Sequence, residues 1–319
     1  MKSRTLVIIL ILIPLLIALM PKFVRIAKVT IKVVDEERKP VKGAKIDIYL
    51  YRASPRNKII KGMTDSEGIF SVSGYSANGV VGGVVEKSDN YYSTFHHDFF
   101  VKKMGIWQPW NKEIQVTLRP IINPVPMYVR NQWSFELPVV DKEIGYDLSK
   151  SDWVPPYGKG EYPDFIFKVE RKYKDISNFD ATLILTFPNK YDGIQVVKEN
   201  PGGDFKVGSR FRLLRRAPEG GYQQKLVKRL SSGASGIIDD AANDDNYVFR
   251  VRSEVENGQL KRAMYGKILG KIAFDVRGSK TSSIHMHYYL NPDYTRNLEF
   301  DPKRNLFTNL PEGEGVGLP

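Results

Sequence analysis

Residues 29–50 read VTIKVVDEERKPVKGAKIDIYL, and this stretch decides the fold that we expect for the first part of the chain. Apolar and polar residues alternate from 29 to 35 and again from 44 to 51, which is typical of strands with one buried face. The residues on the buried face are Val29, Ile31 and Val33 in the first run and Ala44, Ile46, Ile48 and Leu50 in the second. The polar residues 36–39 and Pro40 between the runs predict a turn.

Further short strands follow at similar spacing, at 69–72, 79–85 and 114–118. A turn is predicted at 64–68, where Asp65 can accept hydrogen bonds from the next backbone amides and Gly68 can take a positive φ. Several short strands separated by such turns favour an antiparallel β-sandwich over residues 29–120.

Two strings in this region resemble the carboxypeptidase regulatory-like domain: VVDEERKPVKGAKIDIYL at 33–50 and GMTDSEGIFSV at 62–72. The resemblance implies a seven-strand, transthyretin-like sandwich that serves as a structural or binding module. It does not imply peptidase activity, because in that family the module accompanies a separate catalytic domain. The chain has no His-x-x-Glu zinc motif, and its last residues, Gly-Val-Gly-Leu-Pro, differ from the tail of the hydroxyisourate-hydrolysing branch of the fold.

The N-terminus has the layout of a secretory signal or a membrane anchor. Residues 5–20 read TLVIILILIPLLIALM and follow a short basic head with Lys2 and Arg4. No Ala-x-Ala-like cleavage site follows, which favours an uncleaved anchor within residues 1–28. As a helix the apolar run spans about 24 Å against a hydrocarbon core of about 30 Å, so basic side chains at its ends would have to reach the interface. We therefore expect an exported protein on the periplasmic or cell-surface side, anchored in a bacterial inner membrane by residues 5–20.

Charge and cysteine content narrow the class of protein. The net charge is +12, and residues 1–28 contribute five basic residues and no acid, so the folded part is only mildly basic. A nucleic-acid-binding protein should instead concentrate its lysines and arginines on one element of the fold. The absence of cysteine excludes disulfides, cysteine-bound metals and a lipoprotein anchor, and it favours a bacterial envelope protein over an extracellular eukaryotic one.

The rest of the chain divides into a predicted linker and a second β domain. Residues 121–160 are rich in proline and also carry Trp133, Phe135, Trp153 and Tyr157, which predicts an extended linker that packs along the domains. Residues 161–319 show almost no helical periodicity and predict an antiparallel sandwich or an open barrel. The expected strands lie at 165–169, 181–187, 193–197, 247–253, 264–276, 283–290 and 297–301. Residues 231–236 are expected to form a flexible loop, and Gly266 and Gly270 are expected to mark β-bulges.

Four aromatic residues form a candidate binding group near the end of the first domain: Tyr91, Tyr92, Trp107 and Trp110. Exposed, they would make a stacking platform for a sugar ring or a membrane contact; buried, they would cap the sandwich or seal a domain boundary.

Two further groups could hold a metal ion. Asp239, Asp240, Asp244 and Asp245 concentrate the oxygen ligands that calcium prefers, although the run lacks the EF-hand spacing and its closing glutamate. His285 and His287 should lie on one face of a strand, with His96 and His97 as a source of further ligands. The alternatives are a solvated acidic loop and a solvated strand face.

The sequence therefore favours a non-catalytic exported protein of the cell envelope with a structural or binding role. No catalytic residue, phosphate-binding loop or nucleophile motif stands out, and no cofactor other than calcium is expected. The expected partners are the membrane and either an envelope glycan or another protein. Two alternatives stay open: an exported hydrolase of glycan or another envelope polymer that uses carboxylates of the second domain, and a glycan-binding module that uses Trp107 and Trp110.

Overall fold

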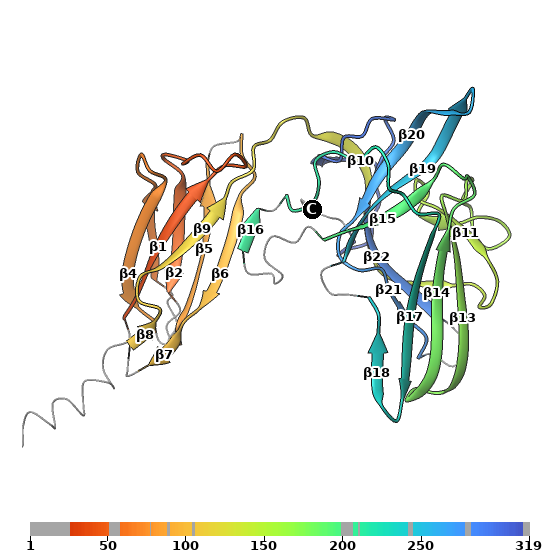
Figure 1. Ribbon diagram of the computed structural model, residues 1–319, viewed down its shortest axis with the longest axis horizontal. Coiled ribbons are helices and arrows are strands. Elements are labelled where there is room, and N and C mark those ends of the chain that lie inside the picture. Colours follow the sequence, from red (N-terminus) through yellow and green to blue (C-terminus); the bar gives the residue numbers. More distant parts are fainter. Residues whose placement is uncertain are drawn as a thin grey trace, which may run out of the picture. The chain divides into compact units, whose positions relative to one another are not determined.

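The computed structural model describes residues 26–50, 58–76, 78–87, 90–103, 106–198, 207–209, 211–241, 245–277 and 282–314. Every regular element in these ranges is a β-strand (Figure 1), which confirms the prediction of an all-β fold. The predicted anchor at 5–20 lies outside the described residues. Within the described ranges, no helix has the length and apolar character needed to cross a membrane.

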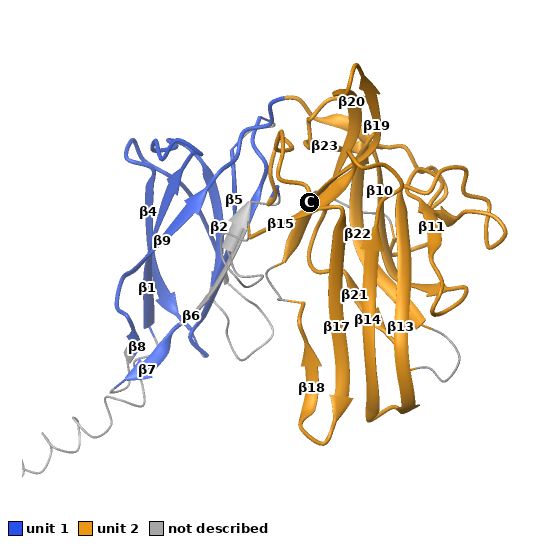
Figure 2. Cartoon of the chain, turned by 45° about the vertical axis from the view of Figure 1, so that its right-hand side comes forward, with its two compact units in different colours: residues 1–122, 201–211 blue, residues 123–200, 212–319 orange. Residues whose placement is uncertain are grey.

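The chain forms two compact units (Figure 2). Unit 1 comprises residues 1–122 and 201–211, and unit 2 comprises residues 123–200 and 212–319. The first division falls after residue 122, and the sequence analysis expects the first domain to end at residue 120. The assignment of residues 201–211 to unit 1 differs from the sequence prediction. The strand at 207–209 pairs with a segment more than a hundred residues earlier in the chain.

Unit 1 is built from two sheets. Its strands are β1 (Ile26–Val34), β2 (Lys45–Leu50), β3 (Lys58–Met63), β4 (Ile69–Tyr75), β5 (Val80–Glu86), β6 (Thr94–Phe99), β7 (Val101–Lys103), β8 (Ile106–Gln108), β9 (Lys112–Thr117) and β16 (Val207–Ser209). One sheet has the order β4-β1-β9 and the other the order β16-β6-β5-β2-β3, while β7 and β8 form a separate ribbon. All pairs are antiparallel except β1 with β9.

The core of unit 1 contains six of the seven residues that the alternation predicts, and the side chain of the seventh, Leu50, lies outside the described part of the structure. Val29, Ile31 and Val33 of β1 are at most 2% exposed, as are Ala44, Ile46 and Ile48, and all six belong to one hydrophobic cluster. The turn before β4 also forms as expected. Asp65 accepts hydrogen bonds from the backbone amides of Glu67 (3.0 Å) and Ile69 (2.8 Å). Gly68 has a φ of 72°, and a Cβ there would lie 2.4 Å from the carbonyl oxygen of Val33, so only glycine fits.

Unit 2 is a larger sandwich of two sheets. Its strands are β10 (Val125–Leu137), β11 (Ile144–Asp147), β12 (Asp152–Trp153), β13 (Phe165–Asp175), β14 (Asn178–Thr186), β15 (Gly193–Val197), β17 (Lys225–Gly233), β18 (Gly236–Asp239), β19 (Asn246–Glu256), β20 (Gln259–Ile268), β21 (Ala273–Asp275), β22 (Ser282–Asn291) and β23 (Phe300–Asn305). One sheet has the order β15-β19-β20-β22-β10-β23, with β21 paired to β22, and the other has the order β12-β11-β13-β14-β17-β18.

The two sheets of unit 2 share one apolar core. Phe167 and Leu183 come from the β12–β18 sheet, Phe249 and Tyr288 come from the β15–β23 sheet, and all four are at most 1% exposed. The rings of Phe165 and Phe249 meet edge to face across the sandwich, with centroids 5.0 Å apart. Unit 2 therefore has two separate sheets, each with its own end strands, and is not a closed barrel.

The segment predicted as a linker is instead part of the second sandwich. β10 pairs with β22 along most of its length and with β23 at its start, and β11 and β12 extend the opposite sheet. Pro126 is tolerated because the pairing of β10 with β23 shifts register between Val125 and Met127. Two of the four aromatic residues of this segment serve the core, since Trp153 is buried and Phe135 packs against it, whereas Trp133 and Tyr157 are exposed.

Two other predictions in the second half are wrong. Residues 231–236 are not a flexible loop, because they close the hairpin between β17 and β18. Gly266 is not a bulge, since it pairs in register with both Phe249 and Leu290. It is a glycine because the ring of Phe249 lies over it, where an added Cβ would be 2.1 Å from Cζ. Gly270 lies just after β20 and has a φ of 79°.

Candidate functional site

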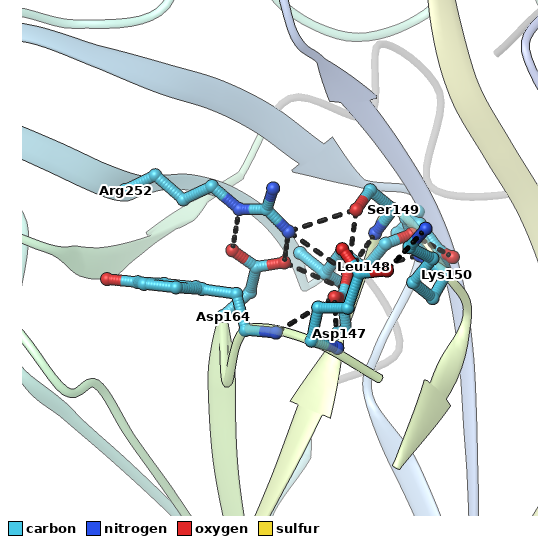
Figure 3. Close-up of polar contacts among 9 residues, drawn as sticks. Asp147, Leu148, Ser149, Lys150, Asp164 and Arg252 are labelled. Atoms are coloured by element: carbon cyan, nitrogen blue, oxygen red, sulfur yellow. Dashed lines mark hydrogen bonds and ion pairs between the residues drawn. The ribbon is translucent and has the colours of Figure 1, made fainter. Parts of the chain in front are cut away.

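Three charged side chains that the sequence did not predict to be neighbours meet inside unit 2. Arg252 of β19 extends toward Asp147, at the end of β11, and toward Asp164, just before β13 (Figure 3). Asp147 and Asp164 are at most 1% exposed, and the Arg252 side chain is 22% exposed. We call Asp147, Asp164 and Arg252 the buried charge cluster.

Arg252 binds both carboxylates at once. Its Nε donates to Asp164 Oδ1 at 2.7 Å, and its Nη2 donates to Asp164 Oδ2 at 2.8 Å and to Asp147 Oδ1 at 3.0 Å. The guanidinium also lies over the ring of Tyr162, 5.1 Å from its centroid. Two-point binding of this kind uses the planar fork of arginine and could not be reproduced by lysine.

Asp147 closes the loop that leaves β11. Its Oδ1 accepts the backbone amides of Ser149 and Lys150 at 2.8 and 3.0 Å and the hydroxyl of Ser149 at 2.7 Å. Its Oδ2 accepts the amides of Glu161 and Tyr162 at 2.9 and 3.0 Å. Burial by itself would raise the pKa of Asp147, but the hydrogen bonds from the Ser149 side chain and from these amides outweigh it and hold the pKa below its ordinary value.

Asp164 is held at the other end of the same loop. It accepts the backbone amide of Leu148 at 2.9 Å in addition to the two bonds from Arg252. Burial raises the pKa of Asp164 to about 6, because the hydrogen bond and the positive charge of Arg252 compensate only part of the lost hydration.

A β-bulge aims Arg252 at the cluster. The pairing of β19 with β20 shifts register between Val251 and Glu254, and Arg252 has a φ of 51° in the left-handed region. The bulge is held from the 189–192 turn, since Asn189 Nδ2 donates to the carbonyl of Ser253 at 2.7 Å and the Ser253 amide donates to Asp192 Oδ1 at 3.0 Å. Simple alternation predicts that Arg252 points outward beside Arg250, and the bulge is the reason that it does not.

The geometry of the buried charge cluster suits the fixing of loops. Both oxygens of Asp147 and both oxygens of Asp164 already accept hydrogen bonds from backbone amides or from Arg252. A carboxylate that serves as a general base or a nucleophile must instead reach a substrate. In this arrangement the two carboxylates tie the loop between β11 and β13 to β19.

The raised pKa of Asp164 predicts a pH dependence of stability. In the unfolded chain the carboxyl titrates near 3.8, whereas in the folded chain it titrates near 6. Between these values the folded state holds a proton that the unfolded state has lost, so the contribution of Asp164 to stability falls as the pH rises from 4 to 6. The expected fall is up to about 3 kcal/mol.

Urea unfolding of the wild type and of Asp164→Asn at pH 4, 5, 6 and 7 measures this effect. The stability of the wild type relative to the variant should decline across the window. The pKa of Asp147 is lowered in the folded chain, so the stability that Asp147 contributes is lost only when the pH falls below the ordinary aspartate pKa. Asp147 therefore does not mask the trend between pH 4 and 6. A difference that is constant with pH would show that Asp164 keeps an ordinary pKa.

The four aromatic residues of the predicted binding group do not share one surface. Trp107 is 7% exposed and donates its Nε1 to the carbonyl of Ser76 at 2.9 Å, and Tyr92 is 3% exposed and stacks on Phe211 with centroids 5.0 Å apart. Tyr91 is half-buried, and Trp110 is 49% exposed. Trp107 and Tyr92 therefore pack in unit 1, and of the four only Trp110 is exposed. A binding role for Trp110 stays a prediction.

The acidic run of unit 2 is engaged with basic groups and with the backbone. Asp245 lies between Lys198 and Lys228, Asp239 pairs with Lys271 at 2.7 Å, and Asp240 accepts the amide of Arg229 at 2.8 Å. Asp244 lies outside the described residues. Within the described ranges, no three His, Asp or Glu side chains are grouped so that they could hold a metal ion. The calcium site stays a prediction that these contacts do not support.

His285 and His287 share one face of β22, as predicted, but each is engaged with an aromatic ring. His285 stacks on the exposed Trp133, with centroids 5.3 Å apart, and His287 stacks on the buried Tyr289, with centroids 4.9 Å apart. Burial lowers the pKa of His287 to about 4. The side chains of His96 and His97 lie outside the described part of the structure.

No protein-family model matches the chain, and no curated protein matches it. Among solved structures, the chain is similar to a DUF3823 family protein from Parabacteroides merdae, with 8% identity, a TM-score of 0.21, and coverage of 86% of this chain and 98% of the other. It is also similar to a point mutant of the shaft pilin SpaA from Lactobacillus rhamnosus GG, with 12% identity, a TM-score of 0.23, and coverage of 73% and 89%. Similarity at this level says nothing about function, so the function has to be argued from the residues of the chain.

Proposed function

We propose that the protein is a non-catalytic structural or binding protein of the bacterial cell envelope, exported and held at the membrane by residues 5–20. The observation that carries the non-catalytic part is the buried charge cluster. It is the place in unit 2 where Arg252 gathers two carboxylates, and their oxygens are bound to backbone amides and to the guanidinium. These groups stabilise loops and are not turned toward a substrate.

Unit 1 supports a role as a spacer or binding module. The turn that carries part of the resemblance to the carboxypeptidase regulatory-like domain has the expected Asp65 hydrogen bonds and the expected positive φ at Gly68. In that family the module accompanies a separate catalytic domain, which agrees with the proposed role. The apolar run at 5–20, with its basic head, supports export.

Deleting residues 5–20 tests the proposed location. The full-length chain is expected in the membrane fraction of a bacterial host, resistant to extraction with salt, and its folded part should be digested when protease is added to spheroplasts. The deletion variant should be found in the soluble fraction and be protected from protease, because it lacks the apolar segment that directs export. A full-length chain that is soluble and protected would contradict the proposal.

A second measurement tests the non-catalytic role. The purified full-length protein is incubated with isolated cell-wall glycan, and new reducing ends are measured. We expect no release above a boiled sample. Release that disappears in Asp164→Asn, with an unchanged fold, would support the hydrolase instead.

A further inference from the structure

Strand β18 is an apolar sheet edge. It is the last strand in the order β12-β11-β13-β14-β17-β18, and within the described ranges it pairs only with β17. Its four residues are all exposed, and Ile237 and Ile238 are 71% and 54% exposed. Since successive side chains point to opposite faces, both faces of this edge present an isoleucine to solvent.

Edge strands β3 and β23 carry lysine or proline, which discourage pairing, and β18 carries neither. Edge strand β3 contains Lys58 and Lys61, and edge strand β23 contains Pro302, Lys303 and Arg304. Lysine, proline and short length are the usual means by which a sheet edge avoids joining another strand. β18 is short, but it has no lysine, arginine or proline between Gly236 and Asp239. Among the described strands, none pairs with its outer edge.

We propose that β18 pairs antiparallel with β18 of a second copy of this chain, with Ile237 opposite Ile237 of that copy. A closed dimer needs a two-fold axis, and an axis perpendicular to a sheet places one residue opposite itself. If that residue is Ile237, Ile238 faces Gly236, and Asp239 lies beside the hairpin turn that precedes Gly236 in the other copy. The two Ile237 side chains then contact across the axis, and no like charges are opposed.

The alternative register is less favourable. Centring the axis on Ile238 would place Asp239 opposite Ile237 and Asp240 opposite Gly236, so each charged group would lie against an apolar or empty position. The self-complementarity of the first register is the reason to assign a second copy as the partner. A strand of four residues buries less surface than the roughly 1,200–2,000 Å² of a stable interface, so the dimer should be weak and dependent on concentration.

Cysteine crosslinking of the full-length chain tests this pairing, because the native sequence contains no cysteine. Directly opposed residues of an antiparallel pair lie about 4.5–5.5 Å apart at Cα, which is within the range of a disulfide. Ile237→Cys, oxidised in the membrane or in detergent, should therefore give a disulfide-linked dimer on a non-reducing gel. Ile238→Cys faces a glycine of the other copy and should not.

Ile176→Cys is the matched control for random collision. Ile176 lies in the turn between β13 and β14 of the same sheet and is 62% exposed. Ile237→Cys should give at least about tenfold more dimer than either Ile176→Cys or Ile238→Cys, since a disulfide requires close and specific geometry. Equal yields at 176 and 237 would overturn the inference, and a dimer from 238 in place of 237 would overturn the register.

Sedimentation provides an independent measurement without cysteine. The wild-type chain in detergent should shift from monomer to dimer as its concentration rises. Ile237→Lys should stay monomeric at the same concentrations, because pairing would place the lysine ammonium groups of the two copies opposite each other. Unchanged unfolding of Ile237→Lys would show that the exposed substitution leaves the fold intact. A wild type that stays monomeric throughout would overturn the inference.

Discussion

Replacing Arg252 with methionine is expected to lower the free energy of unfolding by about 3–5 kcal/mol, because it leaves two buried carboxylates without their common partner. Asp147 and Asp164 are at most 1% exposed, and Arg252 donates three hydrogen bonds to them at 2.7–3.0 Å. Methionine keeps much of the length of the arginine stem, so the effect reports mainly the lost guanidinium. Urea unfolding at pH 7, followed by the fluorescence of the buried Trp153, measures it.

Arg262→Met is the matched control. Arg262 also binds a carboxylate at 2.7 Å with two nitrogens, but it and its partner Glu254 are 50% and 43% exposed. Solvent screens such a pair, so its removal should change stability far less. If the two variants unfolded at the same urea concentration, the buried charge cluster would not be holding unit 2 together. Loss of stability in Arg252→Met should also be largest above pH 6, where Asp164 is ionised.

Replacing Gly266 with valine is expected to destabilise unit 2 by about 3 kcal/mol, since the site has no room for a side chain. A Cβ at this position would lie 2.1 Å from Cζ of Phe249 and 2.4 Å from the carbonyl oxygen of Tyr289. The ring can move only by disturbing its edge-to-face contact with Phe165, and the carbonyl belongs to the neighbouring strand. The variant should therefore show a lower urea midpoint and weaker near-UV circular dichroism.

Gly233→Val separates this steric effect from the general effect of changing a strand glycine. Gly233 ends β17, and no atom lies within 4 Å of a Cβ built on it. The exposed variant should unfold close to the wild type. If it were as destabilised as Gly266→Val, the packing of Phe249 over Gly266 would not be the cause.

The elements that were predicted correctly are those whose signal is local. Alternation in 29–35 and 44–51 identified the buried residues of β1 and β2, and the Asp65 turn needed only contacts within four residues. Predictions failed where a distant contact changed the meaning of a local pattern. Proline around residue 126 indicated a linker, but β10 accommodates it through a register shift against β23.

The buried charge cluster illustrates the same limit. Asp147 and Arg252 are 105 residues apart, and alternation along β19 predicts an outward Arg252. The sequence did carry one signal of the cluster. Asp147 and Asp164 lie near the two ends of one loop, and Asp164 directly precedes the buried Phe165. A carboxylate beside a core residue needs a partner. Nothing in the local pattern named that partner.

By itself, the sequence determined the all-β class, the strands with regular alternation and the chemistry of the Asp65–Gly68 turn. These follow from the period of two along a strand and from hydrogen bonds between near neighbours. Only the tertiary structure decided that residues 207–209 join unit 1, that the bulge at Arg252 completes the buried charge cluster, and that β18 ends a sheet with both isoleucines exposed. Each of these features depends on which strands become neighbours and in which register they pair. The register is set by the apolar surface that all strands of the core bury together, and no short segment of sequence contains that information.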